Sequence, residues 1–154
     1  MIFLIIGECG VGKTWVMKQL LKQSKGYKLG LYYFNETETH IIVGKYDNST
    51  FEGSDRLSMA VMKDLDKMLG YIKKANKIAI FEGDRFMNKN FINKANPLII
   101  KIKGDGKSGR IKRGSQQTER QLKTIKTRVG NIKFNKEVEN SYECLKEIKK
   151  YENN

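Results

Sequence analysis

The chain has 154 residues, a length that predicts one domain with room for a hydrophobic core. It holds 30 lysine and arginine residues against 17 acidic residues, and the resulting formal charge of +13 attracts polyanions. Its two isolated cysteines and single histidine exclude a disulfide framework and a zinc site, so a reducing cytoplasm is the expected compartment.

A glycine-rich loop follows the first predicted strand. Ile2 to Ile6 form an apolar run that predicts a buried strand, because the run is too short to span a membrane and unlike the core of a signal peptide. We therefore expect no membrane partner. The next eight residues, GECGVGKT, fit the Walker A pattern G-x-x-x-x-G-K-[ST] at every fixed position.

This Walker A loop predicts a binding site for ATP. Its glycines let the backbone turn tightly with the N–H groups pointing inward, and the helix that begins near Lys13 adds its positive dipole end. The Lys13 ammonium would reach the β- and γ-phosphates, and the Thr14 hydroxyl would bind Mg²⁺. The residues of this loop expected to bind ATP are Gly7, Cys9, Gly10, Val11, Gly12, Lys13 and Thr14.

Helical and extended patterns alternate after this loop. A helix is predicted from Lys13 to about Lys25, with Gly26 as its stop. Leu29 to Phe34 and His40 to Val43 are rich in β-forming residues, and the polar turn between them suggests a hairpin.

A polar loop and an amphipathic helix come next. Residues 44–54 are too many for a simple connector, and long ordered loops in small domains are often functional. Ser54 is placed to cap the helix, and Asp55 beside it is either a catalytic base or a second capping residue. The apolar stripe of this helix consists of Leu57, Val61, Leu65, Met68, Leu69 and Ile72.

Carboxylates follow the next buried strand. Lys77 to Phe81 predict that strand, and Glu82 and Asp84 come at its carboxyl end, as in a Walker B site. We expect Glu82 to order the Mg²⁺ shell and Asp84 to lie nearer the phosphoryl acceptor. A hydroxyl acceptor also needs a base, for which Asp47, Asp55 and Asp84 all remain candidates.

The last third of the chain is strongly basic. From Lys101 to Lys136, twelve basic residues stand against two acidic ones, an excess of ten positive charges. Such a field attracts a polymer more strongly than one mononucleotide requires, and we expect DNA as a partner. A solvated, lysine-rich surface is the alternative.

Arginines near a glycine-rich segment complete the predicted site. Residues 104–115 predict a mobile basic lid loop because they hold several glycines and few apolar anchors. Arg110 and Arg113 from this lid, and Arg120 from the next helix, would close over the transferred group, with Arg110 also binding ATP. The other elements predicted here are a helix at Asn88–Ala95, a strand at Leu98–Ile102, a helix at about Gln116–Val129, a strand at Ile132–Val138 and a helix from Ser141.

The order of these elements predicts an α/β fold. Strands that alternate with helices after a glycine-rich first turn indicate the three-layer P-loop NTPase fold, with a parallel sheet of about five strands and helices on both faces. Residues 1–154 would form a single P-loop kinase domain. Its ligand site would lie outside the carboxyl ends of the strands. The residues expected to act in catalysis there are Lys13, Asp55, Asp84, Arg113 and Arg120.

The chain resembles P-loop kinases of the nucleoside monophosphate kinase type. The resemblance rests on the strand, Walker A loop and helix at the start, on the run FEGDRF at 81–86, and on the arginine-rich lid. The runs YDNSTFEGSDRLS at 46–58 and GSQQTERQ at 114–121 are also similar to segments of small virus-encoded P-loop kinases. Some members of that group phosphorylate 5-hydroxymethyluracil within DNA, and this similarity spans most of the chain. A viral origin would place the protein in the host cytoplasm.

Three functions are therefore compatible with the sequence. The resemblance implies an ATP-dependent kinase that uses Mg²⁺ and phosphorylates a hydroxyl on a base in DNA, with 5-hydroxymethyluracil as the expected acceptor. A deoxynucleoside monophosphate kinase that acts on free nucleotides is the first alternative, and the short chain without a separate lid domain argues against it. The second alternative is a nucleic-acid-binding ATPase that has no phosphoryl acceptor.

Overall fold

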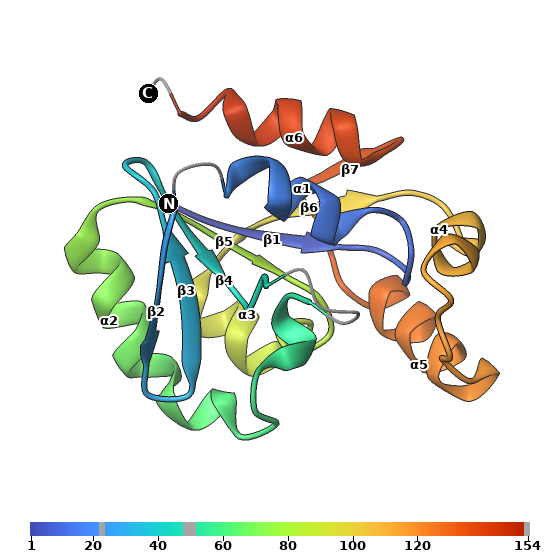
Figure 1. Ribbon diagram of the computed structural model, residues 1–154, viewed down its shortest axis with the longest axis horizontal. Coiled ribbons are helices and arrows are strands. Elements are labelled where there is room, and N and C mark those ends of the chain that lie inside the picture. Colours follow the sequence, from blue (N-terminus) through green and yellow to red (C-terminus); the bar gives the residue numbers. More distant parts are fainter. Residues whose placement is uncertain (22–23, 48–51, 153–154) are drawn as a thin grey trace.

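A seven-stranded sheet forms the centre of the computed structural model, which describes residues 1–21, 24–47 and 52–152. The strands are β1 (Ile2–Ile6), β2 (Lys25–Leu29), β3 (Tyr32–Glu36), β4 (His40–Val43), β5 (Ile78–Glu82), β6 (Leu98–Ile102) and β7 (Lys136–Val138). They lie in the order β2-β3-β4-β5-β1-β6-β7 (Figure 1). From β4 to β7 neighbouring strands in this order are parallel, whereas β2 and β3 form an antiparallel edge. The described residues therefore form a mixed α/β fold. Its sheet contains the predicted five parallel strands, and β2 and β3 add an antiparallel edge that the prediction omits.

The antiparallel edge begins in a stretch that was predicted as helix. The first helix ends at Leu20, the last residue of its buried stripe, and Lys25 already pairs with Glu36 in the sheet. Gly26 is therefore part of β2 and does not stop a helix. Gly30 has a φ of +58°, which allows the tight turn that leads from β2 to β3. The predicted hairpin is confirmed, since β3 pairs antiparallel with β4.

Helices cover both faces of the sheet. They are α1 (Lys13–Leu20), α2 (Leu65–Ala75), α3 (Lys89–Ala95), α4 (Lys107–Lys112), α5 (Glu119–Gly130) and α6 (Ser141–Lys149), together with the 3-10 helices η1 (Ser54–Arg56) and η2 (Val61–Asp64). Figure 1 shows α1 and α6 on one face and α2 and α3 on the other. Because side chains of a strand alternate between faces, Phe3 and Ile5 of β1 pack with α1 and α6, and Leu4 and Ile6 pack with α2 and α3. No helix in the described ranges has the length and apolar character needed to cross a membrane.

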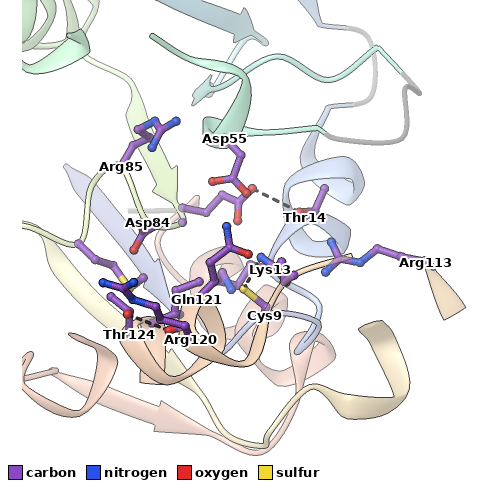
Figure 2. A pocket seen from close by; sticks show the side chains of 15 residues that line it. Cys9, Lys13, Thr14, Asp55, Asp84, Arg85, Arg113, Arg120, Gln121 and Thr124 are labelled. Atoms are coloured by element: carbon purple, nitrogen blue, oxygen red, sulfur yellow. Dashed lines mark hydrogen bonds between the residues drawn. The ribbon is translucent and has the colours of Figure 1, made fainter. Parts of the chain in front are cut away.

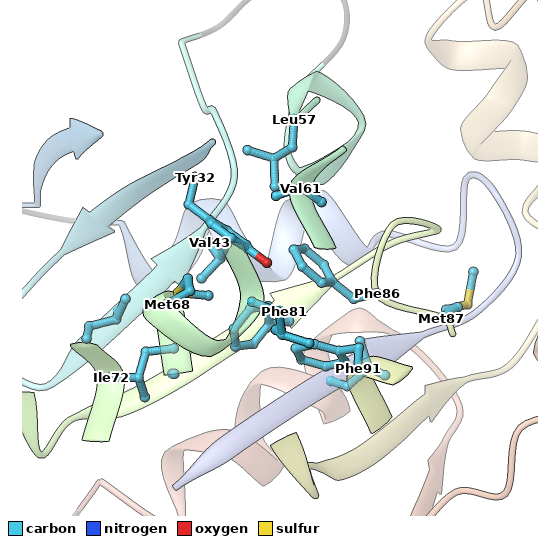
Figure 3. Packing of buried hydrophobic residues seen from close by; sticks show 14 of the residues in the cluster. Tyr32, Val43, Leu57, Val61, Met68, Ile72, Phe81, Phe86, Met87 and Phe91 are labelled. Atoms are coloured by element: carbon cyan, nitrogen blue, oxygen red, sulfur yellow. The ribbon is translucent and has the colours of Figure 1, made fainter. Parts of the chain in front are cut away.

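A cluster of aromatic rings holds the turn that follows β5 (Figure 3). Phe81 at the end of β5, Phe86 after the turn and Phe91 on α3 are all fully buried. Their ring centroids lie 4.7 to 5.1 Å apart, and Tyr32 of β3 stacks on Phe86 from the other side. Buried aromatic rings contribute large apolar areas with specific geometry. Residues 82–85 are therefore fixed between two anchored rings.

The predicted helix from Ser54 is wrong in its first part. The chain forms η1, then an extended residue at Leu57, then η2, and only α2 is a regular helix. Ser54 caps no helix. Its hydroxyl is buried, has no hydrogen-bond partner among the described residues, and lies beside the position where a side chain on Gly83 would be. Residues 54–57 pack against the turn after β5, and this contact outweighs the helical spacing of the apolar residues. Of the predicted polar loop, residues 48–51 lie outside the described part.

The elements of the last third are mostly where they were predicted. The strands β5 and β6 and the helices α3 and α6 are confirmed closely. The segment 104–115 is not a simple loop, because it contains α4 between glycines with positive φ at 104, 106 and 114; its mobility stays a prediction. α5 begins later than predicted because Thr118 and Gln121 form a capping box. β7 is shorter than the predicted strand at 132–138.

Candidate active site

A cavity of about 360 Å³ lies at the carboxyl ends of β1 and β5 (Figure 2). It brings together side chains from the Walker A loop, from η1, from the turn after β5 and from the segment that includes α5. The residues that line it are Cys9, Lys13, Thr14, Asp55, Glu82, Gly83, Asp84, Arg85, Met87, Arg113, Gln117, Arg120, Gln121, Thr124 and Ile125. This convergence agrees with the place predicted for the site at the end of the parallel strands.

The Walker A loop has the backbone of an anion cradle. Gly10 and Gly12 have φ values of +92° and +98°, a region that favours glycine. Gly12 is also the N-cap of α1, and no side chain in the described part of the chain caps this helix end, so the first N–H groups of α1 remain available to an anion. The Lys13 ammonium donates to the carbonyl oxygens of Gly7 and Glu8, each at 2.9 Å. The loop therefore fits a phosphate chain, with one positive charge held at its mouth.

Glu82 is a buried carboxylate at the end of β5. Its side chain is 4% exposed, and its Oε1 accepts hydrogen bonds from the Thr14 hydroxyl at 3.4 Å and from the Tyr46 hydroxyl at 3.3 Å. Burial raises the pKa of Glu82 to about 7; the positive charge of Lys13 opposes this rise, and Asp55 adds to it. Gly53 passes so close that a side chain there would collide with Glu82 Oε1.

Thr14 and Glu82 are the residues that fit a magnesium ion. Mg²⁺ is usually held by one or two carboxylates together with substrate phosphates and water, and a Walker A hydroxyl is one of its usual ligands. The short distance between Thr14 and Glu82 therefore suits an ion carried by a nucleotide in the cradle. Within the described ranges, no three histidine, cysteine or acidic side chains gather as a metal site of their own.

The three candidate bases occupy different surroundings. Asp55 lies at the exposed rim of the cavity; desolvation by the surrounding protein raises its pKa, and the charges of Lys13 and Arg85 oppose this rise. Asp84 forms an ion pair with Arg128 of α5. Asp47 pairs with Arg56 at 3.0 Å and does not line the cavity. Asp55 and Asp84 therefore remain candidates for a base in the cavity, whereas Asp47 lies outside it.

The predicted arginines divide into two groups. Arg113 and Arg120 line the cavity, and Figure 2 shows Arg113 on the side of Thr14 and Arg120 on the side of Asp84. Arg110, predicted to bind ATP, does not line it. Its guanidinium donates to the carbonyl oxygen of Cys9 at 2.8 Å and to that of Asp105, so it holds the outside of the Walker A loop.

The α4 segment lies directly against the Walker A loop. A Cβ atom on Gly106 would collide with the carbonyl of Cys9, and one on Gly109 would collide with the carbonyl of Gly10. Gln117 adds a contact from Nε2 to the Cys9 sulfur at 3.1 Å. The glycines of the predicted lid therefore permit close backbone packing in addition to any freedom of motion.

Tyr46 and Arg128 are site residues that the sequence analysis did not identify. Tyr46 follows β4 and reaches Glu82 across the sheet, and Arg128 approaches Asp84 from α5. Neither has a local motif. For Arg128, the only available signal was its position two turns after Arg120 on the same helix.

Replacing Tyr46 with phenylalanine is expected to raise the pKa of Glu82 above about 7. The Tyr46 hydroxyl donates to the carboxylate and favours its ionised form, so its loss should shift the pKa upward. A carboxyl-carbon NMR titration of Glu82 measures the shift directly. Tyr142→Phe on α6 is the control, because this ring is 58% exposed. An unchanged titration in a folded Tyr46→Phe variant would contradict the assigned hydrogen bond.

Most predicted site residues thus meet in one cavity. Cys9, Lys13, Thr14, Asp55, Glu82, Asp84, Arg113 and Arg120 all line it. Gly7, Gly10, Val11 and Gly12 do not line it but form the loop behind Lys13, and Arg110 holds that loop from outside. In comparisons with known proteins, neither a protein-family model nor a curated sequence matches this chain.

Proposed function

We propose that this protein is an ATP-dependent kinase with the P-loop NTPase fold, which transfers a phosphoryl group to a hydroxyl on a base in DNA, with 5-hydroxymethyluracil as the preferred acceptor. The observation that carries the proposal is the meeting, in one cavity, of the Walker A lysine, the carboxylates of Glu82 and Asp84 at the end of β5, and the predicted arginines Arg113 and Arg120. Phosphoryl transfer requires such a set of fixed charges, because catalysis rests on positioning and on neutralising phosphate charge.

Each group has a role in this reaction. Lys13, Arg113 and Arg120 neutralise the charge of the transferred phosphoryl group, and the N–H groups at the start of α1 hold the donor phosphates. Thr14 and Glu82 would hold Mg²⁺, which supplies further charge neutralisation when bound. The strand order supports the fold assignment, since β1 and β5 are neighbours and bring the Walker A loop beside Glu82.

Asp55 is the better candidate for the base. Its carboxylate faces the cavity from the rim, and its raised pKa brings it closer to neutrality, where general bases are most effective. Asp84 is held by Arg128 and is better placed to orient the acceptor. In the forward step, Asp55 accepts the proton of the acceptor hydroxyl. The oxygen of that hydroxyl forms the new bond to the γ-phosphorus, and the bond from this phosphorus to the leaving nucleoside diphosphate breaks.

The cavity volume limits how DNA could enter. About 360 Å³ is at the lower end of the range for small-molecule sites and suits a single nucleotide unit. A base inside a duplex cannot reach such a cavity, so the reacting nucleotide must be single-stranded or flipped out of the helix. The same volume is also compatible with a free deoxynucleoside monophosphate, which keeps the monophosphate kinase as the second candidate.

Incubation with γ-labelled ATP and Mg²⁺ distinguishes the candidates. The acceptors are DNA containing 5-hydroxymethyluracil, ordinary DNA of the same sequence, and a panel of deoxynucleoside monophosphates. We expect label in the modified DNA and little label in either other group. Label in the monophosphates would favour the monophosphate kinase, and release of free phosphate without labelled acceptor would favour an ATPase.

A further inference from the structure

A second cavity continues from the candidate active site along α5. It has a volume of about 480 Å³ and is lined by Arg120, Lys123, Thr124, Thr127, Arg128 and Asn131, which together define the α5 groove. Arg120 and Thr124 line both cavities, so the groove begins where the candidate active site ends. Arg128 lies at the same boundary, since it pairs with Asp84 of the active site.

The chemistry of the α5 groove is that of a phosphate-binding surface. All six lining side chains can donate hydrogen bonds, three of them are cationic, and no acidic side chain of the described residues lines the groove. Their spacing of three or four residues places them on one face of α5. From residue 120 to residue 131 this face runs for about 16 Å, which is longer than one phosphate group needs. The opposite face, with Val129, is buried against the core.

We propose that the α5 groove binds the sugar-phosphate backbone of a nucleic-acid strand whose reacting nucleotide enters the active site. The inference rests on the proposed function for the identity of that nucleotide, but not for the binding itself. A free nucleotide fills the active site and leaves the groove unused, whereas a strand that leaves the site at Arg120 and Thr124 continues over Lys123 and Thr127. The Thr127 hydroxyl, between these cations, suits a directed bond to a phosphate oxygen or the sugar, whereas the Thr124 hydroxyl donates to the carbonyl oxygen of Arg120 at 2.9 Å.

Two charge reversals on α5 make a matched test. Lys123 lines the α5 groove, whereas Lys126 lies on the same helix, is also exposed and does not line it. Lys123→Glu and Lys126→Glu change the net charge equally, so they weaken any general attraction of the protein for polyanions to a similar degree. A difference between the two variants therefore reports contact in the groove.

The measurement is the anisotropy of a fluorescently labelled single-stranded oligonucleotide of mixed sequence, titrated with protein at several salt concentrations without ATP. We expect Lys123→Glu to weaken binding about tenfold and to reduce the slope of log affinity against log salt by at least about one. Lys126→Glu should weaken binding less than about threefold. Thermal unfolding of both variants, with Lys123→Ala as a milder change, shows whether the fold is retained.

Three results would overturn the inference. The first is an equal loss of oligonucleotide affinity in Lys123→Glu and Lys126→Glu, and the second is an absence of oligonucleotide binding. The third is that polyglutamate displaces the oligonucleotide as effectively, per charge, as unlabelled DNA does. The last would make the surface a general polyanion site. Because the assay contains no ATP, selective loss in Lys123→Glu supports the groove even if no phosphoryl transfer is found. If the enzyme phosphorylated a free monophosphate and the two charge reversals weakened oligonucleotide binding equally, the proposal for the α5 groove would be rejected and the kinase proposal would stand.

Discussion

Replacing Lys13 with alanine is expected to lower kcat/KM for phosphoryl transfer by about a thousandfold or more. The Lys13 ammonium is held at 2.9 Å from the carbonyl oxygens of Gly7 and Glu8, in front of the N–H groups of α1. Its removal takes a positive charge from the place where the phosphates would lie. Since Lys13 is not part of either apolar core, the thermal unfolding temperature should change little.

The control for this variant is Lys18→Ala, on the same helix but outside the cavity, which should retain transfer. Nucleotide binding can be followed separately through Trp15, because it is the only tryptophan, follows Thr14 directly and is 41% exposed. We expect the Lys13→Ala variant to lose most of the nucleotide-dependent change in fluorescence. Full transfer activity in this variant would reject the kinase assignment.

Replacing Glu82 with glutamine is expected to stabilise the protein above pH 7 and to slow Mg²⁺-dependent transfer strongly. In the unfolded chain a glutamate ionises near 4.5, whereas burial raises the pKa of Glu82 to about 7 in the folded protein. The folded state therefore favours the protonated carboxyl. Its stabilising contribution is complete below pH 4.5 and is lost as the pH rises through 7. Glutamine carries no charge and avoids this loss.

The expected size of the effect follows from the shift between these two pKa values. At pH 8 the free energy of unfolding of Glu82→Gln should exceed that of the wild type by roughly 3 kcal/mol, and the difference should vanish near pH 4. Urea unfolding at several pH values measures it. Transfer should fall at least about a hundredfold, because the amide is a poor Mg²⁺ ligand. Glu38→Gln, an exposed change before β4, is the control. A pH-independent difference in stability would contradict the buried carboxylate.

The predicted site residues that the structure brings together most closely are those with local signals. Lys13 and Thr14 belong to a contiguous motif, and Glu82 follows an apolar run whose length and composition predict a buried strand. Each depends on neighbours within a few positions, and the structure brings all three to one cavity. Local patterns therefore sufficed to predict that these three residues lie together.

The parts that were missed depend on contacts between distant positions. Tyr46 and Glu82 are separated by 36 positions, Asp84 and Arg128 by 44, and no periodic pattern encodes either pair. η1 also depends on a contact between distant positions, because Ser54 lies against Gly83 and does not cap a helix. The β2 strand was missed because Lys25 and Gly26 resemble a helix end until their partners in β3 are known.

The packing of α4 on the Walker A loop has a consequence for how the protein is made. Cys9 is synthesised before its partners Arg110 and Gln117, which follow 101 and 108 positions later in the chain. Contacts of such high sequence separation are completed late in folding. The Walker A loop therefore lacks its outer wall until these later residues have been synthesised. A nascent chain released before residue 117 would hold the complete Walker A motif and lack the surface that supports it.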